Sequence, residues 1–132
     1  MYDRELIAEI FRNITWAIDQ ITKRFLAIGS SEDFIKDDQG LEKLDSICMQ
    51  LINIDEALKE IDKLTGGKFL VNYPEIDWKK AKGMRDIITH HYFDIDAETV
   101  FTVCSKHLPK MKTVVDTVLL DLQKSKKETN LE

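Results

Sequence analysis

An arginine, two histidines and a tyrosine lie within eight residues near the middle of the chain. The segment reads Arg85-Asp-Ile-Ile-Thr-His90-His91-Tyr92. A guanidinium can bind a phosphate and stabilise developing negative charge, an imidazole can carry a proton at neutral pH, and a phenol supplies a hydroxyl. An arginine, a histidine and a tyrosine are together sufficient to bind or cut a phosphodiester without a metal ion.

Each of these three side chains also has an ordinary structural role. Arg85 could pair with Asp86, Asp94 or a carboxylate on another helix. His90 could cap the C-terminus of a helix, and Tyr92 could be a core aromatic residue with its hydroxyl at the rim. Taken singly, each structural role is the more common one. The chain holds only four arginines and three histidines, however, so their grouping here favours a site.

The residues around this motif are basic, although the chain is acidic. Residues 78–92 hold three lysines, one arginine and one aspartate, a local balance of +3, whereas the formal net charge of the chain is −5. The acidic total argues against a general nucleic-acid coat. A local basic patch predicts a phosphate site, and the alternative is a solvated lysine face. The candidate substrate contacts are Lys79, Lys82, Asp86 and His91.

We expect neither a metal site nor a cofactor. His90 and His91 are adjacent and face different directions, His107 is remote, and the paired spacings of zinc ligands do not occur. Cys48 and Cys104 are lone cysteines inside apolar helical patterns. They predict buried, reduced thiols and a cytoplasmic protein.

The elements that must position the motif are helices. Apolar residues recur every three or four positions over residues 2–28, 41–65 and 96–122, and from Asp77 into the motif. Short connections between such helices predict an all-α, antiparallel bundle of four to five helices. No apolar run is long enough to span a membrane, and the charged N-terminal stretch is unlike a signal peptide.

We expect one domain over residues 1–132, with a flexible polar tail at residues 124–132. Each apolar stripe should face the core, including Leu6, Leu41 and Ile87. Phe34 is the buried candidate in the polar connector that follows the first helix, and a helical turn could form there.

Particular residues should set the helix ends. Gly29 should terminate the first helix, and the glycines at 66–67 the second. Asp77 and Asp96 are good N-caps for the third and fourth helices. We expect a kink or break near His107, because the proline two residues later removes a hydrogen-bond donor.

The motif itself predicts a helix distortion. On an ideal helix Arg85 and Tyr92 are seven residues apart and nearly eclipsed, whereas His90 lies about 140° from Arg85. The three side chains can therefore meet only if the helix ends or distorts between Thr89 and Tyr92. The poor helix propensity of this run is compatible with such a distortion.

The motif and its flanks resemble those of the HepT-type HEPN proteins. Arg85-x4-His90-x-Tyr92 matches their Arg-x4-His-x-Tyr signature, and residues 78–86 and 92–96 look like the family's lead-in and exit. The resemblance implies a HEPN-like helical bundle that forms a homodimer, with arginine and histidine of both subunits lining a shared cleft. It also implies a metal-independent endoribonuclease that acts as the toxin of a toxin–antitoxin pair.

The resemblance further implies a partner and residue roles. An MntA-like nucleotidyltransferase antitoxin would neutralise the toxin by transferring AMP from ATP to Tyr92. On an RNA substrate His90 would move the proton, Arg85 would clamp the phosphate and Tyr92 would orient it. Two alternatives stay open: a non-catalytic helical dimer that binds a nucleotide or a nucleotidyltransferase, and a plain four-helix interaction protein.

Overall fold

The computed structural model describes residues 2–90 and 96–131, and every regular element in these two stretches is a helix. The α-helices are α1 (Arg4–Phe25), α2 (Asp38–Thr65), α3 (Trp78–Ala81), α4 (Met84–His90), α5 (Ala97–Thr102) and α6 (Leu108–Leu131). Two 3₁₀ turns, η1 (Ser31–Phe34) and η2 (Leu70–Asn72), lie in the connections, and a π-helical segment, η3 (Val103–His107), joins α5 to α6.

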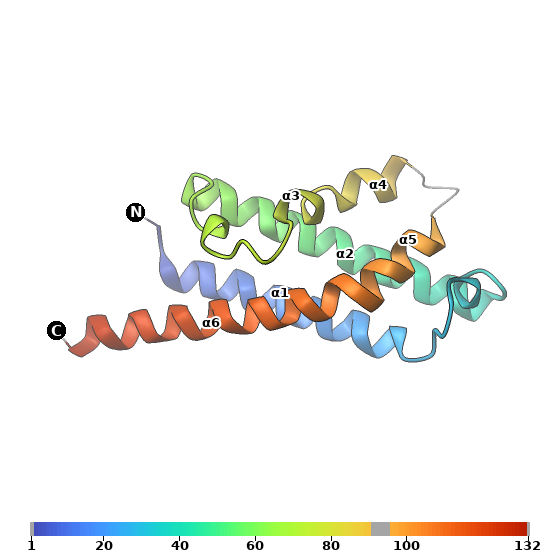
Figure 1. Cartoon of the computed structure of the whole chain (residues 1–132), viewed down its shortest axis with the longest axis horizontal. Helices are drawn as coiled ribbons and strands as arrows, with labels where there is room; N and C mark the ends of the chain where they lie inside the picture. The colour runs from blue at the N-terminus through green and yellow to red at the C-terminus, as the bar shows by residue number, and fades with distance from the viewer. Residues whose placement is uncertain (1, 91–95, 132) are drawn as a thin grey trace.

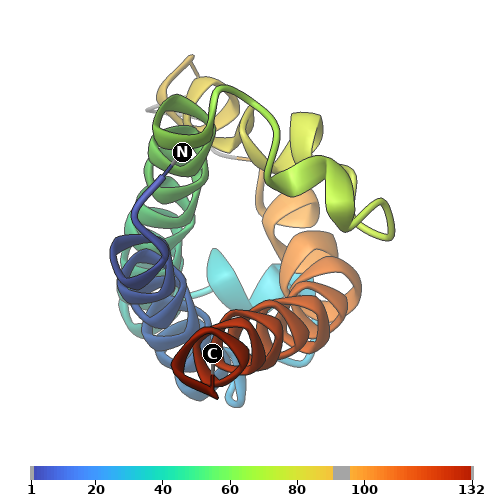
Figure 2. The same ribbon diagram turned by 90° about the vertical axis from the view of Figure 1, so that its left-hand side faces the viewer.

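The helices run lengthwise: α2 runs opposite to α1, α3 and α4 follow each other in one direction, and α5 and α6 follow each other in the opposite direction (Figure 1). α1 packs against both α2 and α6, whereas α3 and α4 lie on α2. The end-on view shows the same arrangement, with α1 between α2 and α6 (Figure 2). The expected all-α, antiparallel bundle is confirmed.

The core is built from the apolar stripes of these helices. Phe34 is fully buried, as expected, and it closes one end of the core from η1. The expectation that Leu6, Leu41 and Ile87 face the core is wrong, because they are 39%, 41% and 45% exposed. These residues lie at the edges of their stripes, where a helix of a small bundle turns back toward solvent. Other fully buried side chains are Ile7, Phe11, Ile14, Ile18, Ile21, Ile47, Leu58, Ile61, Val115 and Val118.

The end of α1 differs from the expectation. The helix stops at Phe25, and Gly29 lies beyond it as part of the next turn. There the N–H of Gly29 donates to the carboxylate of Asp33 at 2.7 Å, and that of Ser30 donates to it at 3.2 Å. Gly29 therefore belongs to the N-terminus of η1, and its expected role as the terminator of α1 is wrong.

The ends of α2 are set by local chemistry. Asp37 caps the helix by accepting from the N–H of Gly40 at 2.8 Å, so α2 begins three residues earlier than residue 41. Gly40 is required there, because a Cβ would lie 2.0 Å from the backbone oxygen of Asp33. At the other end Gly66 takes a left-handed φ of 62°, which confirms the expected glycine stop.

The third expected helix is two short helices. Asp77 does cap α3, since its carboxylate accepts from the N–H of Lys80 at 3.1 Å. The helix then closes in a tight turn, in which the N–H of Gly83 donates to the carbonyl of Lys80 at 3.0 Å. α4 starts anew at Met84. The continuous helix expected from Asp77 into the motif is thus wrong.

The fourth expected helix is irregular where the proline predicted it. Asp96 caps α5 by accepting from the N–H groups of Glu98 and Thr99, as expected. The chain then widens into η3, where the N–H of Leu108 donates to the carbonyl of Val103, five residues back. The expected kink near His107 takes the form of this π-helical segment.

Three further expectations concern the two cysteines, membrane spans and the C-terminal tail. Cys48 and Cys104 are free and buried, and burial raises the pKa of each thiol to about 12. No helix in the described part of the chain is both long and apolar enough to cross a membrane. α6 continues to Leu131, and a flexible tail over residues 124–132 stays a prediction.

Candidate active site

The motif begins on α4, close to α2. Arg85 is the second residue of this seven-residue helix, and His90 is its last. The side chain of His90 and the whole of His91 and Tyr92 lie outside the described residues, as does the distortion expected between Thr89 and Tyr92. The structure therefore bears on the arginine half of the motif.

Arg85 is held at three points. Its backbone N–H donates to the Asp55 carboxylate at 2.7 Å, and its carbonyl accepts from the hydroxyl of Thr89 at 2.8 Å. Its guanidinium pairs with Glu56, with 2.6 Å between Nη1 and Oε1. The partner is thus a carboxylate on another helix, one of the ordinary partners that the sequence left open. The side chain of Arg85 is nevertheless 52% exposed, so a ligand can approach it.

The ion pair shifts the pKa of both of its members. The hydrogen bond from Arg85 lowers the pKa of Glu56, and the hydrogen bond to Glu56 raises the pKa of Arg85. Arg85 therefore stays cationic, as a phosphate-binding group must. Any phosphate that reaches this guanidinium has to displace the Glu56 carboxylate from it or share the guanidinium with that carboxylate.

Asp55 is a charged residue in the core. Its relative exposure is 0%, although it sits on α2 beside apolar residues. A buried carboxylate requires compensation. Here one oxygen accepts from the backbone of Arg85, and the other lies 3.0 Å from the ammonium of Lys59.

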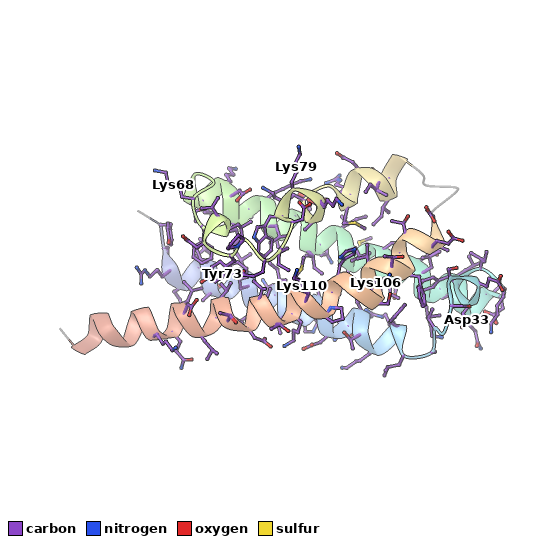
Figure 3. All side chains as sticks on the ribbon, viewed as in Figure 1. Asp33, Lys68, Tyr73, Lys79, Lys106 and Lys110 are labelled. Carbon is purple, nitrogen blue, oxygen red and sulfur yellow. The ribbon has the colours of Figure 1, made fainter. Side chains whose placement is uncertain are left out.

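The basic patch expected from the sequence is partly neutralised by α2. The ammonium of Lys82 pairs with Asp62, just as Arg85 pairs with Glu56. Lys79 is exposed and projects outward from α3 (Figure 3), and Asp86 is exposed on α4. Residues 78–92 carry a local balance of +3 in sequence, but the fold places the acids Glu56 and Asp62 of α2 opposite them.

A groove of about 740 Å³ runs between the α3–α4 side and the α5–η3–α6 side of the bundle. It is largely apolar, and α4 forms part of its wall. Its lining includes Ile54, Met84, Ile87, Val103, His107 and Met111. In the described part of the chain, no three histidine, cysteine or carboxylate side chains gather as metal ligands, and catalysis without a metal stays a prediction.

The sequence reasoning missed the charged residues of α2 that lie against this segment. Asp55 and Glu56 contact Arg85, whereas Lys59 pairs with Asp55 and Asp62 pairs with Lys82. Asp55, Lys59 and Asp62 follow one another at spacings of four and three, so they share one face of α2. A signal was present, because Asp55 lies between Ile54 and Leu58 at a position that the apolar stripe places inside. A carboxylate at a core position indicates a specific polar partner.

The chain resembles named ribonucleases. It is 34% identical over 76 residues to the protein named putative RNase MJ0125 of Methanocaldococcus jannaschii, covering 58% of this chain and 60% of that one. It is 24% identical over 120 residues to putative RNase MJ0127 of the same organism, covering 91% and 89%. With putative RNase TTE0752 of Caldanaerobacter subterraneus it shares 30% over 90 residues, covering 68% and 74%.

The matches differ in extent. The chain spans about three fifths of the length of MJ0125. No solved structure matches this chain at a significant level. The model of the family described as "Ribonuclease HepT-like" matches residues 14–118, which include Asp55, Glu56 and the whole motif. This match covers most of the chain, and the protein belongs to the HepT-like ribonuclease family.

Proposed function

We propose that this protein is a metal-independent endoribonuclease and that Arg85, His90 and Tyr92 are its catalytic residues. Family membership supports the reaction class. The observation that carries the proposal is the state of Arg85, whose backbone is fixed by Asp55 and Thr89 while its guanidinium is half exposed. A fixed cation that a ligand can approach is the arrangement that phosphate stabilisation requires.

The reaction needs one proton acceptor, one proton donor and charge stabilisation. His90 takes the proton of the RNA 2′-hydroxyl, the 2′-oxygen attacks phosphorus, and the bond from phosphorus to the 5′-oxygen breaks. The leaving 5′-oxygen takes a proton from a water molecule, and the protonated His90 gives the 2′-hydroxyl proton to the hydroxide that remains. The other product carries a 2′,3′-cyclic phosphate. Arg85 stabilises the negative charge on the phosphoryl oxygens, and the Tyr92 hydroxyl orients them.

The substrate surface extends beyond these residues. Lys79, Lys82, Asp86 and His91 are the proposed contacts to RNA. Of the two lysines, Lys79 is exposed, whereas Lys82 is half-buried and paired with Asp62. Because α2 acids offset part of this patch, we propose that a homodimer brings two patches together around one cleft. Two copies then contribute their arginines and histidines to a shared site.

The proposed cellular role is that of a toxin in a toxin–antitoxin pair, acting in the cytoplasm. An MntA-like nucleotidyltransferase would neutralise it by adenylylation: the Tyr92 oxygen attacks the α-phosphorus of ATP and pyrophosphate leaves. The added AMP would place bulk and negative charge in a cleft meant for RNA.

A second function is favoured by one contact. The guanidinium of Arg85 is already paired with Glu56. A helical module that holds a nucleotide or a nucleotidyltransferase without cutting RNA would tolerate a permanently paired arginine.

A growth and RNA-integrity assay separates the two functions. The wild type is expressed without a partner protein, beside Arg85→Ala and His90→Ala. The matched controls are Arg12→Ala, which removes an exposed arginine paired with Glu5 at 3.0 Å, and His107→Ala, outside the motif. Growth arrest with RNA cleavage in the wild type and both controls, but in neither motif variant, supports the ribonuclease. Intact RNA in every strain supports the binding module.

A further inference from the structure

The starting point is the short helix that carries Arg85. α4 has seven residues, too few to be stable by itself in water. The residue before Met84 is Gly83, which has no side chain to cap the helix. Asp55 takes this role from α2, because its carboxylate accepts the N–H of Arg85 at 2.7 Å. The first turn of α4 is thus fixed by a residue thirty positions earlier in the chain.

A purely structural device would not require this residue. A buried carboxylate is a poor source of stability, since apolar residues of similar volume often serve as well or better. What a carboxylate supplies is a defined direction and distance. Asp55 is fully buried and is itself held by Lys59 at 3.0 Å. Its oxygen therefore sets the position of the Arg85 backbone within narrow limits.

Glu56, the next residue of α2, acts on the other end of Arg85. Its carboxylate accepts from Nη1 of the guanidinium, and both side chains are about half exposed. A guanidinium carries five N–H donors, so one that is paired in this way can still present donors to a phosphate. Glu56 therefore has two effects, since it orients the guanidinium and also competes with the phosphate for it.

We propose that the adjacent acids Asp55 and Glu56 are the positioning residues of this site, Asp55 fixing the backbone of Arg85 and Glu56 aiming its guanidinium. This inference rests on the proposed ribonuclease function. Two consecutive residues of one helix then set both the place and the direction of the phosphate-binding group. The site thus extends onto α2, well before the motif in sequence.

The two residues predict different kinetic signatures. Removing the Asp55 carboxylate displaces Arg85, and a misplacement of about 1 Å lowers a rate about 100-fold, so Asp55→Ala should lower kcat by about that factor. Asp55→Asn keeps an oxygen that can accept the Arg85 N–H and should recover kcat to within about tenfold of the wild type.

Glu56 should separate kcat from KM. Glu56→Ala removes both orientation and competition, so kcat and KM should both fall. Glu56→Gln keeps an acceptor oxygen but loses the charge, so it should restore kcat while KM stays low. Glu60→Gln is the matched control, because it removes the same charge from an exposed glutamate one turn further along α2. It should leave both constants unchanged.

The experiment measures kcat, KM and urea stability of the full chain on a fluorescent single-stranded RNA, for these variants and Arg85→Ala. The expected pattern is loss in Asp55→Ala, rescue in Asp55→Asn and the Glu56 split described above. Three outcomes overturn the inference alone. The Asp55 and Glu56 variants match the wild type, or Asp55→Asn is as slow as Asp55→Ala, or the losses of activity follow the unfolded fraction. A wild type that leaves RNA intact, or cleaves no faster than Arg85→Ala, overturns the proposed function and the inference with it.

Discussion

Helices α1 and α4 are held in the bundle by different forces. α1 is 22 residues long and buries seven side chains along one face. α4 has seven residues and buries Met84 and Ile88, while polar contacts from α2 fix its backbone and its exposed arginine. Apolar burial is not directional, whereas hydrogen bonds to a buried carboxylate are.

The difference separates the framework from the site. α1 and α2 supply stability through area removed from water, and this area tolerates small shifts. α4 supplies a position, which a shift of one ångström would spoil. Substitutions in α1 should therefore be detected by unfolding measurements, and substitutions in α4 by the rate of RNA cleavage.

The largest effect should come from the framework. Phe11→Ala removes a fully buried ring from α1, and such truncations cost about 3–5 kcal/mol. We expect a fall of this size in the free energy of unfolding, measured by urea titration with circular dichroism. Arg12→Ala, at the next position but exposed, is the control and should change it little. A small loss in Phe11→Ala would contradict the division between the two regions.

The reverse pattern is expected at α4. Arg85→Ala should lower the RNA cleavage rate about 10²–10³-fold, since it removes the group that stabilises developing charge. Its urea midpoint should stay close to that of the wild type, because its ion pair is half exposed. A variant that unfolds readily instead of losing cleavage would place Arg85 with the framework.

A backbone change at the far end of α2 should be intermediate in size. Gly66 has a φ of 62°, and a side chain in that conformation costs about 1–2 kcal/mol. Gly66→Ala should lose this much stability and keep its cleavage rate, measured at a temperature where both proteins are folded. Nothing lies within 4 Å of the added Cβ, so backbone conformation is the only cause tested. A fall in cleavage would link this end of α2 to the site.

The smallest effect should appear with pH. The pKa of Glu56 lies below its ordinary value of 4.5, so the ion pair with Arg85 is fully present above that value and is lost as the pH falls through the lower folded pKa. The ¹⁵N chemical shift of the Arg85 side chain should move in this acidic range. In Glu56→Gln this movement should disappear. A shift that persists in the variant would assign the titration to another group.

Local patterns in the sequence predicted local features of the fold. Asp77 and Asp96 cap the helices that follow them, and Gly66 ends α2, because each effect depends on neighbours within a few residues. The stripes predicted the bundle, and Phe34, the buried candidate of the polar connector, is buried as expected. The expected role of Gly29 was wrong because its N–H donates to the Asp33 carboxylate in the next turn.

Features that depend on contacts between distant residues were not predicted. After the break between α3 and α4, the first turn of α4 is capped by Asp55, which lies thirty positions earlier in the chain. The pairing of Arg85 with Glu56 and of Lys82 with Asp62 also joins residues far apart in sequence. The catalytic roles of Arg85, His90 and Tyr92 stay predictions, and so does the dimer.

The π-helical segment makes the spacing between α5 and α6 a matter of residue count. Because the N–H of Leu108 reaches back five residues to Val103, this stretch holds an extra residue relative to an α-helical turn. Each residue of an α-helix turns it by about 100°. Deleting one residue from Val103–His107 would remove only this extra residue, so it would restore a regular helix and leave Val115 and Val118 facing the core. Deleting a residue within the regular part of α6 would instead turn the side chains beyond it by about 100°. The π-helical segment is therefore the place where this long helix can lose a residue without changing which side chains face the core.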